Sequence, residues 1–316
     1  MEENKTSLTT PTVHSVVSAD GTAIGFERLG AGPVLVLVQG AMGTAYTFRE
    51  LAEALADSFT VIVPDRRGGG MSPRRFDPGY TIADDVADLD AVLRATDGRF
   101  VFGLSSGGDI VLEAALTLPR IERLAVCEPA ILLDGIPAKG IERFNAYVEA
   151  DDLPGILVAG MKLSRQGPAI MRAMSDWLVK PAIKRIMKAE EKTDAGDYAP
   201  MEELAEALPY DVAIAQSIDG GSITKFKDIK QPVLLLGGSR SPHFLKRALD
   251  GLEQIIPDAT RVEITGVDHA AAWNVDRRRN PHGNPTGVAE VLKTYLTTVT
   301  SGAMARKVIS SRDEQA

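Results

Sequence analysis

The sequence has few of the features on which several kinds of protein depend. A single cysteine among 316 residues excludes an intrachain disulfide and a cysteine-based metal cluster. No apolar run approaches the ~20 residues that span a bilayer. The net charge is −8 with acids and bases mixed along the chain, so no basic stripe for nucleic acid is visible. We therefore expect neither a membrane nor a nucleic-acid partner.

The start of the chain also lacks a targeting signal. Met1 to Thr10 are polar and contain no apolar segment of the secretory kind, so the expected location is cytoplasmic. With 44% apolar and 25% charged residues, the composition is that of a globular protein. This length accommodates one large domain with an insertion or two small domains.

Short apolar runs alternate with segments of helical spacing through the first part of the chain. Buried strands are predicted at 34–38, 59–63, 100–104 and 121–127, and again at 232–236 and 261–265. Such alternation predicts a parallel sheet with right-handed crossovers. Between the two groups of strands only helical patterns occur, including 169–178 and 201–208. The expected organisation is an arm (1–11), a core (12–130), a helical insertion (131–226), the rest of the core (227–300) and a tail (301–316).

The central motif is Gly103-Leu104-Ser105-Ser106-Gly107, between a predicted strand and a predicted helix. A turn this tight strains the serine backbone, and the two glycines leave room because they have no Cβ. The turn would lift the Ser105 hydroxyl off the sheet and direct the Ser106 N–H toward the same space. This context is typical of a nucleophile elbow.

Three further segments accompany the elbow in a fixed order. They are Gln39-Gly40-Ala41-Met42-Gly43, the run from Asp65 to Ser72, and Gly266-Val267-Asp268-His269. On these four signatures the chain resembles the α/β-hydrolase family from about Val13 to Thr298. The resemblance implies an α/β fold, in which a mostly parallel central sheet is flanked by helices and the helical insertion forms a lid.

A serine hydroxyl needs a neighbouring base before it can act as a nucleophile. Among the four histidines, His269 lies in a loop after the last core strand, where the family places its base. His14 is near the N-terminal arm, His243 begins a helix, and His282 lies in a polar loop. We therefore expect Ser105 as nucleophile and His269 as base.

The acid that orients the base is less usual. Most family members carry an aspartate after the strand that follows the lid, but residues 237–242 contain no acid. Asp250 lies about two helical turns beyond this segment, which is too remote to reach the histidine. Asp268 is adjacent to His269 in the sequence, and its side chain is expected to point away from the histidine ring. Glu128 ends the strand after the elbow helix, a position similar to that used by certain haloalkane dehalogenases and zearalenone-type lactone hydrolases. We expect Glu128 to orient His269; the alternative is a strand-end carboxylate paired with an arginine.

The resemblance also implies an oxyanion hole made of two backbone N–H groups, which we assign to Ala41 and Ser106. Asp65 and Arg66 are expected to brace the loop that contains them. Met42 and the lid residues Met161, Met174 and Trp177 are candidates for contact with a hydrophobic substrate, although self-packing of the lid is the better explanation for most of the lid residues.

Together these residues predict a serine hydrolase without cofactor or metal that cleaves a small hydrophobic carboxylic ester or lactone through an acyl-enzyme. Carbon–carbon hydrolysis and perhydrolysis are alternatives, because the same fold supports them. A receptor-like protein that binds a ligand without hydrolysis is another. The oligomeric state stays open, a homodimer included.

Overall fold

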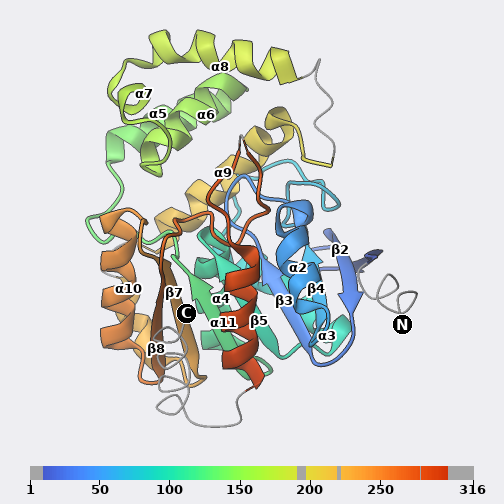
Figure 1. Cartoon of the computed structure of the whole chain (residues 1–316). Coiled ribbons are helices and arrows are strands. Elements are labelled where there is room, and N and C mark those ends of the chain that lie inside the picture. The colour runs from blue at the N-terminus through green and yellow to red at the C-terminus, as the bar shows by residue number, and fades with distance from the viewer. Residues whose placement is uncertain (1–9, 191–196, 219–221, 278, 298–316) are drawn as a thin grey trace.

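The computed structural model describes residues 10–190, 197–218, 222–277 and 279–297 (Figure 1). In this part of the chain eight strands form one sheet in the order β1-β2-β4-β3-β5-β6-β7-β8. The strands are β1 (Thr12–Val17), β2 (Ala23–Gly30), β3 (Val34–Val38), β4 (Thr60–Pro64), β5 (Phe100–Leu104), β6 (Arg123–Cys127), β7 (Val233–Gly238) and β8 (Ala259–Ile264). The first two strands pair antiparallel, β2 pairs antiparallel with β4, and the others pair parallel. The predicted α/β architecture is confirmed.

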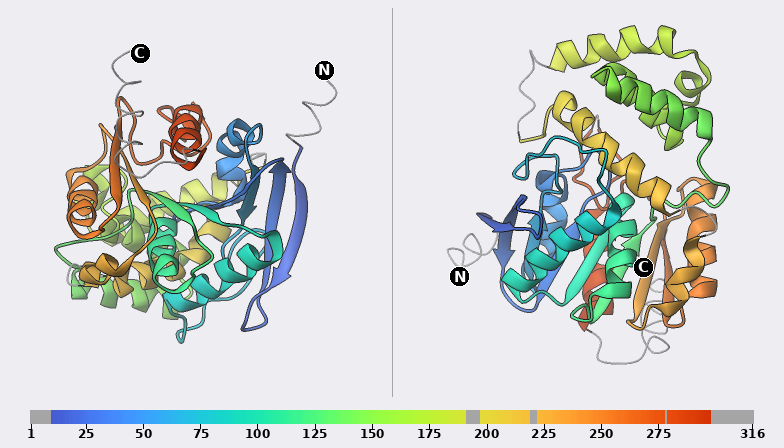
Figure 2. Two further views of the ribbon diagram at one scale, coloured as in Figure 1. Left: turned by 90° about the horizontal axis from the view of Figure 1, so that it is seen from below. Right: turned by 180° about the vertical axis from the view of Figure 1, so that it is seen from behind.

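Helices cover both faces of the sheet because its central strands are apolar on both sides. In β3, Leu35 and Leu37 pack into one core cluster, and Val36 and Val38 into the other. The first cluster lies under α2 (Arg49–Leu55), which follows a short 3-10 turn η1 (Ala45–Phe48), and under α11 (Pro285–Thr297). The second lies under α3 (Ile82–Thr96), α4 (Ser106–Thr117) and α10 (His243–Ile255). Figure 2 shows this sandwich from below.

The lid lies between β6 and β7, above the carboxyl ends of the parallel strands (Figure 1). Its elements are α5 (Ala138–Glu149), α6 (Leu153–Leu163), α7 (Ala169–Ala173), α8 (Asp176–Glu190), α9 (Met201–Ser217) and the 3-10 segment η2 (Ser222–Asp228). Helix α9 also packs against α4 and so belongs to both the lid and the core.

Two of the predicted helices have different limits in the structure. The helix expected over 169–178 is divided into α7 and α8, because Met174 is extended (φ −77°, ψ 154°). Lys162 of α6 donates to the Met174 carbonyl and to the Asp176 carboxylate, which fixes the break from a distance. The helix expected to end at residue 208 continues through Pro209 to Ser217, because its second half buries Tyr210, Val212 and Ile214.

The structure describes only part of the two ends of the chain. Most of the predicted arm (1–11) and all of the predicted tail (301–316) lie outside the described residues. Within the described ranges, no helix has the length and apolar character needed to cross a membrane.

Candidate active site

The elbow motif forms the turn between β5 and α4. Ser105 has φ 55° and ψ −126°, a conformation that is strained for a residue with a side chain. A Cβ on Gly103 would overlap the Gly107 carbonyl oxygen, and a Cβ on Gly107 would overlap the Val38 carbonyl oxygen. The Ser105 N–H donates to the Cys127 carbonyl at 3.0 Å, so the end of β6 helps to hold the turn. The sequence motif therefore adopts the geometry that its glycines suggest.

His269 and Glu128, which are 141 residues apart in the sequence, meet beside this turn. Nδ1 of His269 lies 2.9 Å from Oε2 of Glu128, and the Gly238 N–H donates to Oε1 at 2.7 Å. The Glu128 side chain is completely buried, and its backbone has φ 45°. Burial alone would raise the pKa of Glu128, but the hydrogen bond and charge of His269 and the Gly238 N–H lower it below the ordinary value. Glu128 is therefore held as a carboxylate.

The other acids considered from the sequence do not reach His269. Asp268 accepts a hydrogen bond from the Ala270 N–H at 3.0 Å, within its own loop. Asp250 lies in α10. In the described part of the chain, no arginine forms an ion pair with Glu128, so the strand-end alternative has no partner there.

Ser105 and His269 both follow the carboxyl ends of strands, after β5 and β8 respectively. Among the described residues, no hydrogen bond joins the Ser105 hydroxyl to the His269 ring. In unliganded enzymes such bonds are often long and shorten when substrate binds. The structure therefore holds His269 and Glu128 in contact, with Ser105 at the end of a neighbouring strand of the same sheet.

The loop after β3 lies directly against the serine. A Cβ on Gly40 would come within 2.7 Å of the Ser105 Cβ, so only glycine fits here without a shift. Gln39 is buried, and its side-chain amide donates to the Pro64 carbonyl at the end of β4. In the described chain, the backbone N–H groups of Ala41 and Ser106 have no backbone acceptor. They are thus free to bind a developing negative charge.

The lid covers this loop. Ala41 and Met42 pack against a cluster of apolar lid side chains, which consists of Phe144, Ile156, Ala159, Leu163, Leu208 and Val212. Met42 has φ 62°, a left-handed conformation that only a few non-glycine residues adopt. The position of α5, α6 and α9 is therefore linked by direct packing to the position of the Ala41 N–H.

Asp65 braces its loop as predicted. Its carboxylate accepts the N–H groups of Ala45 at 2.6 Å and Met71 at 2.8 Å. Burial raises the pKa of Asp65 to about 6, although these two N–H groups act in the opposite direction. The loop after β4 is thus fastened to the start of η1 by a single side chain.

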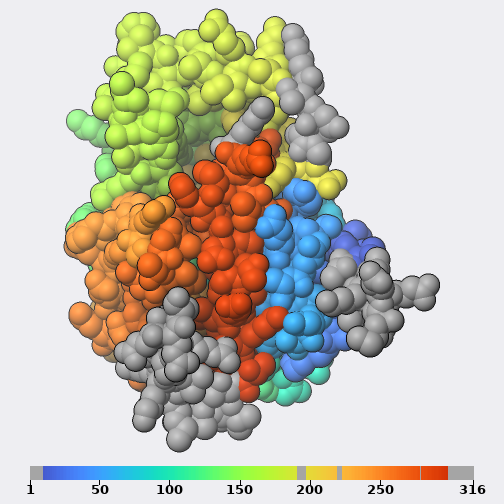
Figure 3. Space-filling view, in the orientation of Figure 1, coloured from blue at the N-terminus to red at the C-terminus, as the bar shows by residue number. Residues whose placement is uncertain are grey.

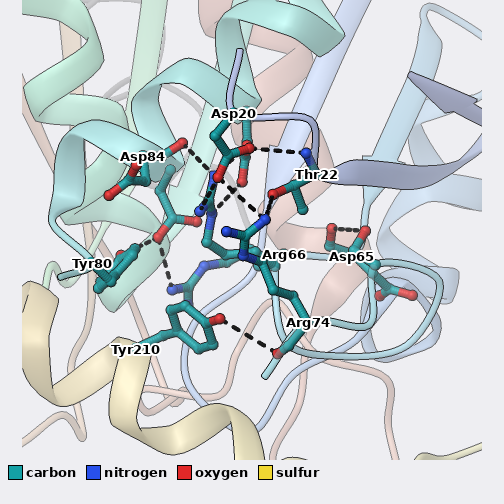
Figure 4. Close-up of polar contacts among 12 residues, drawn as sticks. Asp20, Thr22, Asp65, Arg66, Arg74, Tyr80, Asp84 and Tyr210 are labelled. Atoms are coloured by element: carbon teal, nitrogen blue, oxygen red, sulfur yellow. Dashed lines mark hydrogen bonds and ion pairs between the residues drawn. The ribbon is translucent and has the colours of Figure 1, made fainter. Parts of the chain in front are cut away.

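Arg66 has a role that sequence reasoning missed. It donates to Asp211 of α9 at 2.6 Å and to the Ser106 hydroxyl at 3.2 Å, and that hydroxyl donates to Asp211 at 2.6 Å. Arg66 also lies 3.5 Å from Asp85, which accepts a hydrogen bond from Tyr80 (Figure 4). The signal was present in the sequence as an aspartate inside the apolar stretch Tyr210–Ile214. The network joins the lid to the residue that follows Ser105.

The four proposed substrate contacts lie in different surroundings. Met42 lines a small cleft, open to solvent, together with Gly40, Arg66, Leu204 and other residues of the loops and α9; Ser105 and His269 are not among the residues that line it. Trp177 is 72% exposed on α8. Met161 and Met174 lie at the end of α6 and in the break before α8, and neither lines this cleft. Of the four, the structure brings only Met42 to the cleft.

Known proteins provide an independent comparison. The family model described as alpha/beta hydrolase fold matches residues 33–274. A 2-(acetamidomethylene)succinate hydrolase from Mesorhizobium japonicum is 27% identical over 250 residues, which cover 76% of this chain and 82% of that protein. The crystal structure of an alpha/beta hydrolase from Sphaerobacter thermophilus superimposes with a TM-score of 0.71 at 31% identity, covering 90% of this chain and all of that one. An esterase from Thermogutta terrifontis shares the fold, with a TM-score of 0.64 at 21% identity and coverage of 90% and 98%. The family match over most of the sequence is consistent with the strand order and with the turn at Ser105. The chain therefore belongs to the alpha/beta hydrolase family and is a hydrolase.

Proposed function

We propose that this hydrolase cleaves a carboxylic ester or lactone of a hydrophobic substrate through an acyl-enzyme, without a cofactor. The observation that carries the proposal is the contact between His269 and the buried carboxylate of Glu128, beside a strained serine at a strand-to-helix turn. A histidine whose Nδ1–H is fixed by a carboxylate presents Nε2 as a base, and this is the tautomer that serine activation requires.

Each residue then has one task. Nε2 of His269 takes the Ser105 proton while Oγ attacks the substrate carbonyl. The oxyanion receives the N–H groups of Ala41 and Ser106. The imidazolium returns its proton to the leaving alkoxide, which becomes an alcohol; from an ester this alcohol departs, and from a lactone it stays attached as the hydroxyl end of the acyl chain. A water molecule, deprotonated by His269, then attacks the acyl group; the acid is released and Ser105 regains its proton. Glu128 stabilises the imidazolium in both steps.

The cleft favours a neutral substrate. Its charged side chains are already paired, since Arg66 is held by Asp211 and Asp85, and Arg67 donates to Asp88 at 2.7 Å. Met42, Leu204 and Ala207 supply apolar contacts. The position of Glu128, similar to that in zearalenone-type lactone hydrolases, favours a lactone.

A second candidate comes from the relative named as a 2-(acetamidomethylene)succinate hydrolase. A succinate carries two carboxylates, which need free cationic partners. In the described cleft Arg66 and Arg67 are both engaged by aspartates, so this substrate class fits less well.

A fluorophosphonate probe followed by intact-mass spectrometry tests the nucleophile. We expect wild type to gain one probe mass, Ser105→Ala to gain none, and Ser58→Ala, which changes a half-buried serine in the loop after α2, to behave as wild type. Labelling that persists in Ser105→Ala would refute the assignment.

A panel of nitrophenyl esters and lactones, including an anionic ester, then tests the substrate class. We expect turnover of neutral members and little turnover of the anionic one. An activated serine that turns over no panel member would favour carbon–carbon hydrolysis or perhydrolysis. A folded protein that neither labels nor turns over substrate would favour the ligand-binding alternative.

A further inference from the structure

Helix α8 forms the outer edge of the lid (Figures 1 and 3), and it exposes several large apolar side chains. Trp177, Leu178 and Ile186 on this helix are 72%, 44% and 48% exposed, and Ile170 on the neighbouring α7 is 71% exposed. These are four of the seven large hydrophobic side chains exposed in the described ranges. Exposed apolar groups that gather on one element mark a contact surface more often than those scattered singly.

The same helix carries positive charge without negative charge on its outer side. Lys184, Arg185 and Lys188 are exposed and form no ion pair with the residues described. The two described acids of α8 are used elsewhere: Asp176 is buried against Lys162, and Glu190 pairs with Arg279 at 3.1 Å. This local excess of cations occurs in a chain whose net charge is −8.

The spacing places both kinds of side chain on one surface. Leu178, Ala182 and Ile186 follow one another at intervals of four and form an apolar stripe along one side of the exposed surface. Lys184 and Lys188 form a row about 140° around the helix, on the other side of that surface, and Arg185 lies between the two rows. The side between Ile186 and Lys184, which includes Asp176 and Val179, is buried against the lid. Helices that lie in a membrane interface have this arrangement, with apolar groups inserted and Lys or Arg stems reaching toward headgroups.

We propose that the outer face of α8, defined by Trp177, Leu178, Lys184, Arg185, Ile186 and Lys188, docks the protein onto an anionic lipid surface. An anionic lipid surface can bind both kinds of side chain on this face. Its phosphates neutralise the cations, and the apolar side chains insert at the boundary between headgroups and acyl chains. A second copy of the chain fits less well, since a twofold contact would set three cations against the same three. Acidic groups elsewhere on the molecule should repel the anionic surface only weakly, because charges separated by more than about 8 Å are largely screened at physiological salt.

This contact requires no spanning segment, because the helix would lie in the plane of the interface. The expectation of no membrane partner rested on the absence of an apolar run long enough to span a bilayer. That absence does not bear on a peripheral contact with the bilayer surface. The inference is also independent of the chemistry proposed for Ser105, because vesicle binding and probe labelling are measured separately.

Sedimentation of the full chain with vesicles tests the proposal. We expect binding to phosphatidylcholine vesicles that contain phosphatidylglycerol and weak binding to phosphatidylcholine alone, with the difference lost at high salt. The triple variant Lys184→Gln, Arg185→Gln, Lys188→Gln should bind on the order of 100-fold more weakly, from about 1 kcal/mol for each cation. The matched control Arg28→Gln, Lys227→Gln, Lys230→Gln removes the same charge from exposed positions outside α8 and should bind as wild type.

Tryptophan emission gives a second readout at the helix itself. The chain has two tryptophans, so Trp273→Phe leaves Trp177 as the only one. Its emission should shift to shorter wavelength with anionic vesicles. Lack of binding to these vesicles, or equal loss in the two triple variants, would overturn the proposal. So would a dimer in solution that Trp177→Ser dissociates, because a second copy would then be the occupant.

Discussion

Replacing Glu128 with glutamine is the most informative single change in the site. The Gly238 N–H, 2.7 Å from Oε1, requires an acceptor, so the carboxamide oxygen must occupy that position. The amide NH₂ then faces Nδ1 of His269, which lies 2.9 Å from Oε2 in the wild type. Two donors cannot face each other, so Nδ1 must give up its proton and Nε2 must carry it. That tautomer cannot accept the proton of Ser105.

The expected magnitude follows from this tautomer change. In a serine triad the wrong tautomer lowers kcat by about 10⁴-fold, or roughly 5.5 kcal/mol of transition-state stabilisation. KM should change little, because the Glu128 side chain is fully buried and does not meet solvent. Loss of the charged acceptor should also lower the free energy of unfolding by about 1.5–3 kcal/mol. Steady-state kinetics on the best neutral ester, with urea unfolding of the same samples, measures both effects.

The matched control is Asp268→Asn, which changes the acid adjacent in sequence to His269. Its carboxylate bonds only the Ala270 N–H among the contacts described, so kcat should stay within a few-fold of wild type. If Glu128→Gln were folded and its kcat lay within ten-fold of wild type, Glu128 would not be the orienting acid and the reasoning would fail.

Three further outcomes are expected. Asp211→Asn should lower the free energy of unfolding by about 3 kcal/mol in urea, because it leaves the buried Arg66 charge short of its partner at 2.6 Å; no change would show that the pair adds nothing. Gly103→Ala should yield little folded protein and no probe labelling, because its Cβ would overlap the Gly107 carbonyl; normal labelling would contradict the elbow geometry. Because its folded pKa is lowered, Glu128 adds stability above its ordinary pKa of 4.5 that disappears as pH falls through the folded pKa. Wild type should thus lose more stability below pH 4.5 than Glu128→Gln, and parallel curves would refute this.

The parts of the fold that depend on local signals could be predicted from the sequence. The glycines around Ser105 and the apolar run before it determine the elbow, so its place was clear. The contact of Glu128 with His269 could be expected only with help from the family resemblance, since 141 residues separate the two.

Features that depend on how distant elements pack could not be predicted. The break between α7 and α8 is fixed by Lys162 from another helix. Arg66 meets Asp211 because α9 passes over the carboxyl ends of the strands (Figure 2). No local sequence pattern predicts that arrangement. Likewise, Trp177 is a suitable residue for contact with substrate, but its helix lies at the outer edge of the lid.

The position of the lid between two adjacent strands has a consequence for engineering. The chain leaves at the end of β6 and returns in β7, which pair directly, so the sheet is the same whatever length of chain lies between them. Ser105 and Glu128 precede this point and His269 follows it. Helices α5 and α6 reach the site loop through packing on Ala41 and Met42, whereas α9 contributes a buried hydrogen-bonding partner. The exchangeable segment therefore runs from α5 to α8, with α9 retained, and a replacement must keep the packing on Ala41 and Met42 because that packing positions the Ala41 N–H.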